Sequence, residues 1–307
     1  TLPCPGYPEI RLALRPRRLI RRIMAEGPFD AIHIATEGTL GWSARRYCLK
    51  RNLPFTTAFH TRFPEYVSAR FFVPVSWGYW VIRRFHKPAV RTMAATDTLR
   101  KELEDRGFGE TALFSRGVKT ELFRPQDKGK LGWKRPVHLY VGRIAIEKNL
   151  EAFLSLPLEG SKVLVGEGPQ VEELKKAYPD AIFPGPKRGE ELAAHFAEAD
   201  VFVFPSKTDT FGLVMIEALA CGVPVAAFPV PGPLDVIGAR ACREAPGATD
   251  AVGCLSEDLE QAIDCALKID PKQCRDFALG FTWESCARQF ASNLEPIHPE
   301  EPLARAS

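Results

Sequence analysis

Short apolar runs alternate with amphipathic stretches along most of the chain, which predicts a parallel β-sheet flanked by helices. In the first third we expect buried strands at 29–36, 55–60, 92–96 and 111–115, with helices at 16–25, 42–51 and 98–106. A second alternating set predicts strands at 137–141, 162–165, 181–183, 201–204 and 223–228. Its helices are expected at 149–156, 170–177, 189–197, 212–221, 259–268 and 283–294.

The two sets are separated by a polar stretch, 123–134, that has no apolar period and is interpreted as a linker. The 307 residues also suit about two domains of ordinary size. We predict an α/β fold with two doubly wound, Rossmann-like domains. We expect a first domain at 1–124 and a second domain at 125–282. A helix at 283–295 is expected to pack back on the first domain, and 296–307 are expected to form a disordered tail.

Composition excludes several classes of protein. The 41 Lys and Arg against 38 Asp and Glu give a net charge of +3, which is too balanced for a dedicated nucleic-acid binder. No apolar run approaches the ~18 residues of a membrane span, and no signal segment opens the chain. The richest apolar run, 71–82, is interrupted by proline, serine and glycine. A cytoplasmic protein is therefore expected.

The eight cysteines, at 4, 48, 221, 242, 254, 265, 274 and 286, are spread without a Cys-x-x-Cys pair. Histidine pairs at ligand spacing are also missing, so a structural zinc site is not expected. Isolated thiols within apolar sequence suit a reducing compartment. None of the eight has an obvious base partner, so a catalytic cysteine is not expected.

The strongest chemical signal lies in 201–221, where a buried strand, a polar loop and an apolar helix follow one another. Ligands of open α/β sheets bind at the carboxyl ends of strands, and a helix start favours anions or hydroxyl-rich ligands. Asp209 and Glu217 are ~12 Å apart along a helix, too far to serve one reacting atom. Glu217 is either a surface residue or, because its helix neighbours are apolar, a ligand-binding carboxylate.

A second cluster follows the strand at 137–141. Arg143 and Lys148 lie between that strand and the next helix, where two cations would neutralise a diphosphate. An ordinary basic loop is the alternative. The sequence Gly166-Glu167-Gly168 also follows a strand, but a lone Gly-x-Gly is equally compatible with a simple tight turn.

Together these segments resemble the retaining GT-B glycosyltransferases of family 4, with the best likeness to GDP-mannose-dependent α-mannosyltransferases and related lipid glycosyltransferases. The likeness runs from about residue 7 to 294. Its strings are TEGTLGWSARRYC at 36–48, FHTRFPEYVSARF at 59–71, SRGVKTELFRP at 115–125, VGRIAIEKNL at 141–150, VGEGPQ at 165–170 and PSKTDTFGLVMIEALACGVPVAA at 205–227. The family's opening strand and glycine-rich loop have no counterpart after Thr1, so the resemblance implies an N-terminally truncated first domain.

The resemblance also implies roles for individual residues. The family's Glu-x7-Glu motif falls on Asp209, here a shorter carboxylate, and on Glu217, which would hold the ribose hydroxyls. Arg143 and Lys148 would bind the diphosphate. The histidine that contacts the transferred sugar would be His60, whose alternative is a buried histidine bonded to backbone. The remaining donor-binding positions would be Gly142, Gly166, Gly168, Pro186, Lys187, Phe211, Gly212 and Leu213.

The implied activity is transfer of a hexose, with mannose favoured, from a nucleotide-diphosphate sugar to a lipid or glycan hydroxyl. The cations would stabilise the leaving diphosphate, so no metal, cofactor or dedicated nucleophile is expected. Two alternatives stay open, a truncated nucleotide-binding protein without activity and a nucleotide-sugar epimerase.

A basic run precedes the first strand and could rest on the anionic inner face of a membrane together with the apolar segment 71–82. A solvated arginine face and a core segment are the alternative interpretation. The run consists of Arg11, Arg15, Arg17, Arg18, Arg21 and Arg22.

Overall fold

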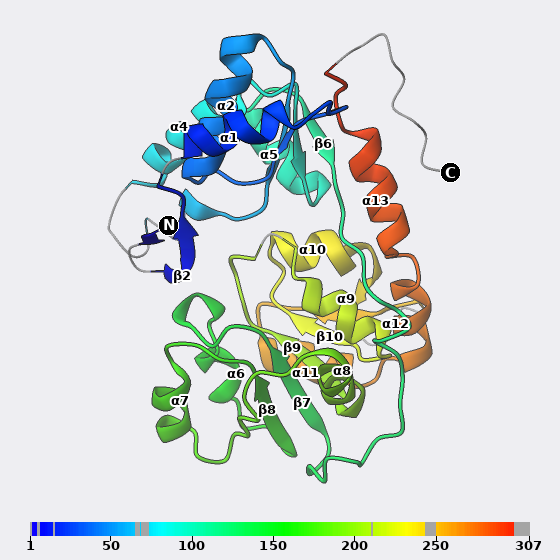
Figure 1. Ribbon diagram of the computed structural model, residues 1–307. Coiled ribbons are helices and arrows are strands. Elements are labelled where there is room, and N and C mark those ends of the chain that lie inside the picture. The colour runs from blue at the N-terminus through cyan, green and yellow to red at the C-terminus, as the bar shows by residue number, and fades with distance from the viewer. Residues whose placement is uncertain are drawn as a thin grey trace. The chain divides into compact units, whose positions relative to one another are not determined.

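The computed structural model describes residues 2–4, 7–14, 16–64, 68, 74–209, 211–242 and 250–297. The chain divides into two compact units (Figure 1). Unit 1 comprises Thr1–Ser115 and Ala287–Ser307, and unit 2 comprises Arg116–Cys286. Each unit holds a parallel sheet with helices, so the predicted α/β class is confirmed.

Unit 1 is built on a four-stranded parallel sheet in the order β3-β4-β5-β6. Thr96 is the N-cap residue of helix α5. Its hydroxyl accepts a hydrogen bond from the Leu99 N–H. Phe59, Phe85 and Met93 are fully buried in the core of unit 1. The elements are β3 (His33–Ile34), β4 (Thr56–Phe59), β5 (Arg91–Ala94), β6 (Thr111–Leu113), α1 (Pro16–Ala25), α2 (Thr39–Arg51), α4 (Val75–His86) and α5 (Asp97–Asp105).

Two features of unit 1 differ from the prediction. The chain opens with an antiparallel pair, β1 (Leu2–Cys4) and β2 (Tyr7–Leu12), where no strand is predicted. The apolar segment 71–82 forms most of helix α4 from Val75 on, while 71–73 and Arg15 lie outside the described residues. Pro8 interrupts the pattern of β2, whereas Pro74 stands directly before α4 as its N-cap residue.

Unit 2 holds a six-stranded parallel sheet in the order β11-β12-β10-β9-β7-β8. The strands are β7 (Val137–Val141), β8 (Ser161–Val165), β9 (Val201–Phe204), β10 (Val225–Ala227), β11 (Ala241–Cys242) and β12 (Gly253–Leu255). The strand predicted at 181–183 is reduced to one bridge between Ile182 and Val163. The short β11 and β12 are not predicted, because two or three residues carry too little periodicity.

Helices cover both faces of this sheet. Val201 and Val203 of β9 belong to a core shared with α6, α7 and α11. Phe202 points to the opposite face, where its ring lies 5.7 Å from that of Phe196 in α8. The helices are α6 (Glu151–Leu154), α7 (Val171–Ala177), α8 (Gly189–Glu198), α9 (Leu213–Ala220), α10 (Pro231–Ile237), α11 (Leu259–Ala266) and α12 (Pro271–Ala278), with single 3₁₀ turns at η1 (Ile146–Lys148) and η2 (Gly238–Arg240).

The segment interpreted as a linker belongs to unit 2 and is bonded to it. The buried Glu198 carboxylate accepts hydrogen bonds from the N–H groups of Gly129, at 2.7 Å, and Lys130, at 3.1 Å. The Lys128 ammonium lies 3.1 Å from an Asp200 oxygen. Burial and the neighbouring Arg135 lower the pKa of Lys128 to about 8. The units meet in sequence between Ser115 and Arg116, ahead of the predicted boundary at 124.

The chain returns to unit 1 within helix α13 (Trp283–Ser292), whose residues from Ala287 on belong to unit 1. The Gln289 side chain accepts a hydrogen bond from the Ser115 N–H at 3.0 Å, and the Asn293 side chain donates one to the Leu113 carbonyl at 2.8 Å. In the predicted tail, the Ile297 N–H donates to the Asp30 carbonyl at 2.7 Å. Residues 298–307 lie outside the described residues.

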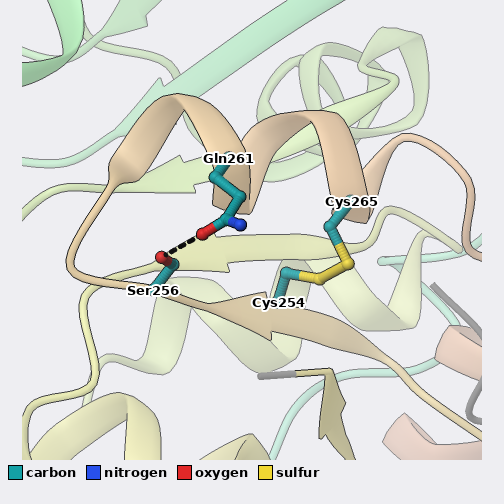
Figure 2. The surroundings of a disulfide bond; sticks show 4 residues. All are labelled: Cys254, Ser256, Gln261 and Cys265. Carbon is teal, nitrogen blue, oxygen red and sulfur yellow. Dashed lines mark hydrogen bonds between the residues drawn. A yellow bond between two sulfur atoms is a disulfide. The ribbon is translucent and has the colours of Figure 1, made fainter. Parts of the chain in front are cut away.

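The sequence indicates isolated thiols, but two of the cysteines are paired. Cys254 of β12 and Cys265 of α11 form a disulfide (Figure 2). Helix α11 packs across β12, which brings two residues 11 positions apart in sequence to a Cα–Cα distance of 6.1 Å. Spacing alone does not reveal such a strand-to-helix pairing.

Candidate active site

The loops after β7 and β9 come together at the carboxyl ends of these neighbouring strands. The Lys148 ammonium lies 2.6 and 2.8 Å from the two oxygens of the Asp209 carboxylate. Both side chains are mostly buried, with exposed fractions of 17% and 19%. A cation and a carboxylate that the sequence places 61 positions apart therefore form one ion pair at the expected edge of the sheet.

Hydrogen bonds between the same two loops hold this pair in place. The Asn149 side-chain amide donates to the Pro205 carbonyl at 3.2 Å, and the Thr208 hydroxyl donates to the Glu147 carbonyl at 3.4 Å. Asn149 has a left-handed backbone (φ 54°) as it ends the η1 turn. The loop carrying Lys148 is thus fixed on both sides of the ammonium-bearing residue.

Arg143, the other predicted diphosphate ligand, lies five residues before Lys148 in the same loop. Its side chain is exposed, and its carbonyl accepts a hydrogen bond from the buried Tyr140 hydroxyl at 2.8 Å. Burial, reinforced by the charge of Asp209, raises the pKa of Tyr140 far above its ordinary value, so this phenol stays neutral and serves as a donor.

Glycines let the loops after β7 and β8 run together beyond the strand ends. Gly142 donates to the Val165 carbonyl at 3.0 Å, and Ile144 donates to the Glu167 carbonyl at 2.9 Å. A Cβ on Gly166 would lie 1.9 Å from the Gly142 carbonyl oxygen, and one on Gly168 would lie 2.1 Å from the Ile144 oxygen. Only glycine permits this approach, so Gly166-Glu167-Gly168 is more than a simple tight turn.

The loop after β9 leads directly into helix α9. Gly212 is its N-cap residue with φ 81°, and a Cβ there would approach Phe204 within 3.0 Å. Phe211 is buried and Leu213 is 40% exposed. The first turn of α10 packs against the same loop, since a Cβ on Gly232 would lie 2.7 Å from the Asp209 carbonyl oxygen.

Glu217 lies on α9 among apolar residues, as the sequence indicates. Burial raises the pKa of its carboxyl group to about 7. Within the described part of the chain its carboxylate has no hydrogen-bond or ion-pair partner. A half-buried carboxylate without a partner is costly, and an unpaired polar group of this kind is typical of a ligand site.

Two further predicted donor residues lie between the bridge at Ile182 and helix α8. Lys187 lies 3.9 Å from a carboxylate oxygen of Glu191, and Pro186 is exposed. The Gly166 N–H donates to the Gly185 carbonyl at 3.2 Å, which places this segment beside the β8 loop. The two residues therefore border the loop that carries Gly166 and Gly168.

His60 belongs to unit 1, whereas the other predicted site residues belong to unit 2. It directly follows β4 and is half-buried, with its ring 6.5 Å from that of Phe114. Its neighbour His33 forms a hydrogen bond with the Thr56 hydroxyl, with 2.9 Å between His33 Nδ1 and the hydroxyl oxygen. Burial, with a smaller effect of His60, lowers the pKa of His33 to about 4, so His33 is neutral near pH 7.

Two buried polar atoms near these loops do not appear among the predicted site residues. The Ser206 hydroxyl and one Asp235 carboxylate oxygen have no hydrogen-bond partner among the residues that the structure describes. Ser206 lies two residues after β9, within the segment that the sequence singles out, so its position was available as a signal. Asp235 lies in α10, a helix that is not predicted, and it had no such signal.

Comparison with known proteins identifies this arrangement. Residues 1–122 match the family described as "Glycosyltransferase Family 4", and residues 135–266 match "Glycosyl transferases group 1". The chain belongs to the GT-B glycosyltransferases of family 4. The predicted family is thereby confirmed, including its relation to GDP-mannose-dependent mannosyltransferases.

Curated relatives of this family-4 glycosyltransferase act on different sugars. It is 33% identical to a sulfoquinovosyl transferase of Arabidopsis thaliana, over 77% of this chain and 50% of the relative. It is 30% identical to a GDP-mannose-dependent alpha-mannosyltransferase of Mycobacterium tuberculosis, over 76% of this chain and 64% of the relative. The chain thus spans between half and two thirds of the length of these relatives.

Solved structures share the fold of this family-4 glycosyltransferase. Sucrose-phosphate synthase from Thermosynechococcus elongatus matches with a TM-score of 0.73 at 24% identity, covering 90% of this chain and 75% of that chain. Anabaena HepE in complex with UDP matches with a TM-score of 0.69 at 15% identity, covering 90% of this chain and 80% of that chain. In the described residues no helix is long and apolar enough to cross a membrane.

Proposed function

We propose that this chain transfers a hexose, with mannose favoured, from a nucleotide-diphosphate sugar to a lipid or glycan hydroxyl, with retention of anomeric configuration. The observation that carries the proposal is the Lys148–Asp209 ion pair at the carboxyl ends of β7 and β9, next to the α9 helix that bears Glu217. Relatives named as GDP-mannose-dependent mannosyltransferases support the choice of donor.

In the proposed reaction, the bond between the anomeric carbon and the diphosphate oxygen breaks, and its electron pair stays on the diphosphate. The acceptor hydroxyl oxygen forms the new bond on the same face of the sugar and passes its proton to the diphosphate. Lys148 and Arg143 stabilise the negative charge that grows on the leaving group. This lowers the barrier because that charge is larger in the transition state than in the bound donor. Asp209 faces the sugar, and the Glu217 carboxylate accepts hydrogen bonds from the ribose hydroxyls.

The proposal is tested by titrating GDP, UDP and ADP, followed by incubation with GDP-mannose, UDP-glucose and UDP-sulfoquinovose. We expect tightest binding of GDP and release of α-mannose from GDP-mannose, detected by NMR of the anomeric proton. Binding without any sugar release or transfer supports a nucleotide-binding protein without activity. Absence of binding to all three nucleotides contradicts the proposal.

The acceptor side of the proposal rests on unit 1. Arg17 and Arg21 of α1 and Arg46, Lys50 and Arg51 of α2 line one recess of about 250 Å³. An apolar cavity of about 350 Å³ lies between the same helices and β3 and shares Ile20 and Tyr47 with that recess. Cations next to apolar lining suit an anionic amphiphile.

Helix α4 adds an exposed aromatic surface to the same unit. Trp77 is 70% exposed, Trp80 57% and Val81 43%. Tryptophan side chains favour the membrane–water interface. We therefore propose peripheral binding of unit 1 to an anionic membrane on its cytoplasmic face, where a lipid acceptor would be reached.

This membrane proposal is tested by flotation with vesicles of phosphatidylcholine alone and with added phosphatidylglycerol. We expect binding only to the anionic vesicles, and loss of binding in W77A/W80A. The matched control is L279A, which removes an apolar side chain that is 46% exposed in unit 2. Equal binding of the double variant and the wild-type chain would contradict the proposed role of α4.

A further inference from the structure

Three cysteine sulfur atoms converge at the β11–β12 edge of the unit 2 sheet. Cys242 of β11 and Cys254 of β12 are register partners on adjacent parallel strands. Cys265 of α11 completes the group, and the three sulfur atoms all lie within 4.8 Å of one another. This is the one cluster of metal-ligand type found among the described residues.

The local sequence fixes how Cys265 reaches this position. Asp258 is the N-cap residue of α11 and accepts hydrogen bonds from the N–H groups of Glu260, at 3.0 Å, and Gln261, at 3.3 Å. The Gln261 side chain accepts a hydrogen bond from the Ser256 hydroxyl at 2.8 Å (Figure 2). These bonds set the turn between β12 and α11, so the last turn of the helix presents Cys265 to Cys254.

The surroundings of the three sulfur atoms are apolar. Cys242 and Cys254 are 5% and 2% exposed and belong to a core cluster with Leu259 and Ala262. Cys265 is half-buried, so it is the most exposed of the three cysteines. Three sulfur ligands without a competing carboxylate favour a soft cation over Mg²⁺ or Ca²⁺.

We propose that the Cys254–Cys265 disulfide is the oxidised form of a three-cysteine site that, once reduced, binds one soft d¹⁰ cation such as Zn²⁺ through Cys242, Cys254 and Cys265. A dithiol or phosphine reductant supplies two electrons and leaves two thiols, and binding of the cation then releases the thiol protons. Tetrahedral Zn–S bonds of about 2.3 Å place the sulfur atoms about 3.8 Å apart. After reduction the Cys254 and Cys265 sulfur atoms, which are bonded to each other in the disulfide, must separate to this spacing, whereas Cys242 already lies within 4.8 Å of both.

The three-cysteine site and the donor site lie on different strands of the unit 2 sheet. Strands β11 and β12 lie at one edge of the sheet, whereas β7 and β8 lie at the other, with β9 and β10 between them. The disulfide and the metal are mutually exclusive at Cys254 and Cys265, so the redox state of the chain controls whether the cation can bind. Cys242 is the residue that distinguishes a metal site from a simple disulfide.

The test uses the full chain, reduced with a phosphine that is then removed under anaerobic conditions. Cd²⁺ is added, and the ultraviolet thiolate-to-cadmium charge-transfer band is recorded. We expect one Cd²⁺ per chain in the reduced protein and no band in the oxidised protein. We also expect loss of the band in C242S, and a full band in C274S, which removes a buried thiol outside the cluster.

A second measurement needs no substitution. The reduced protein is treated with diamide with and without one equivalent of Cd²⁺, and disulfides are mapped by peptide mass spectrometry. Cd²⁺ should prevent the Cys254–Cys265 disulfide from re-forming. Re-formation at the same rate with Cd²⁺, or an unchanged charge-transfer band in C242S, overturns the proposal and leaves an ordinary disulfide.

Discussion

Lys148 and Asp209 form a two-oxygen ion pair, at 2.6 and 2.8 Å, between the loops that follow β7 and β9. The cation that we assign to the diphosphate is therefore positioned by the carboxylate that we assign to the sugar. The ammonium already lies at the strand ends before the donor arrives, so its side chain does not have to be ordered on binding. Pre-positioned charge of this kind is a large source of rate enhancement.

Replacing Lys148 with alanine removes the mostly buried cation. We expect kcat for donor hydrolysis to fall by about 10²- to 10³-fold, as for the loss of one group that stabilises transition-state charge. Lys272→Ala, which removes an exposed lysine paired with Asp276 at 2.7 Å in α12, serves as the control and should leave kcat nearly unchanged. Equal losses in the two variants would exclude a special role of Lys148.

The coupling between the two residues is measurable on its own. In a double-mutant cycle of K148M, D209N and the combined variant, the free energy of unfolding should show a coupling of about 0.5 to 3 kcal/mol. Each single variant leaves a mostly buried group without its partner, which the double variant does not. Additive effects in urea unfolding would show that the pair does not form in solution.

Glu217 makes the stability of the chain depend on pH. The unfolded carboxyl loses its proton near pH 4.5, whereas burial keeps the folded carboxyl protonated to about pH 7. The free energy of unfolding should therefore fall as pH rises from about 4.5 to about 7, by about 3 kcal/mol in total, and then stay level. Urea unfolding of the wild type and of E217Q should differ in this window, with E217Q lacking the decline.

The same carboxyl should make nucleotide binding depend on pH. The ionised form accepts two ribose hydroxyl hydrogen bonds, so GDP affinity should rise as pH increases through about 7, with proton release measured calorimetrically in two buffers. E217Q should bind more weakly and show a flat pH profile. 2′,3′-Dideoxy-GDP should show little of this dependence, and a wild-type profile that is flat for GDP would contradict the ribose assignment.

Gly166 is required by the contact between the β7 and β8 loops. In G166A the new Cβ would lie 1.9 Å from the Gly142 carbonyl oxygen, which should destabilise the chain by about 3 kcal/mol and weaken nucleotide binding. The control is G185A, at a residue with φ +80° and no atom within 4 Å of the added Cβ. Its cost should be about 1 kcal/mol, from backbone conformation alone.

His60 should act on the sugar and not on the nucleotide. We expect H60A to lower sugar transfer by about 10²-fold and to leave the Kd for GDP unchanged, since the candidate nucleotide residues all belong to unit 2. H60Q, which keeps a hydrogen-bonding side chain, should recover part of the activity. A large change in GDP affinity with intact transfer would assign His60 to a different role.

The elements that the sequence predicts best are two strands with continuous apolar runs and one amphipathic helix. Strands at 137–141 and 201–204 and the helix at 16–25 appear with the predicted bounds. Short elements escaped prediction, since β11 has two residues and β12 three. The loop positions of Lys148 and Asp209 were predicted, but their contact was not, because it depends on β9 lying next to β7 in the sheet.

The pairing of cysteines was also beyond the reach of the sequence. Eight cysteines without a motif carry no information about which helix turn faces which strand. The β12–α11 turn decides this, through Asp258 and the hydrogen bond between Ser256 and Gln261. The same limit applies to the buried, unpartnered atoms of Ser206 and Asp235, because solvent exclusion is a property of packing rather than of residue type.

The return of the chain to unit 1 has a consequence for biosynthesis. Unit 2 is one continuous stretch, Arg116–Cys286, whereas unit 1 takes Gln289, Asn293 and Ile297 from the far end of the chain. During translation, unit 1 emerges first and must wait until those last residues leave the ribosome before its β6 strand and its Asp30 segment gain their bonds. The unit made first is therefore the unit completed last, and a released chain that ends after Cys286 should expose unit 1 to protease while unit 2 resists it.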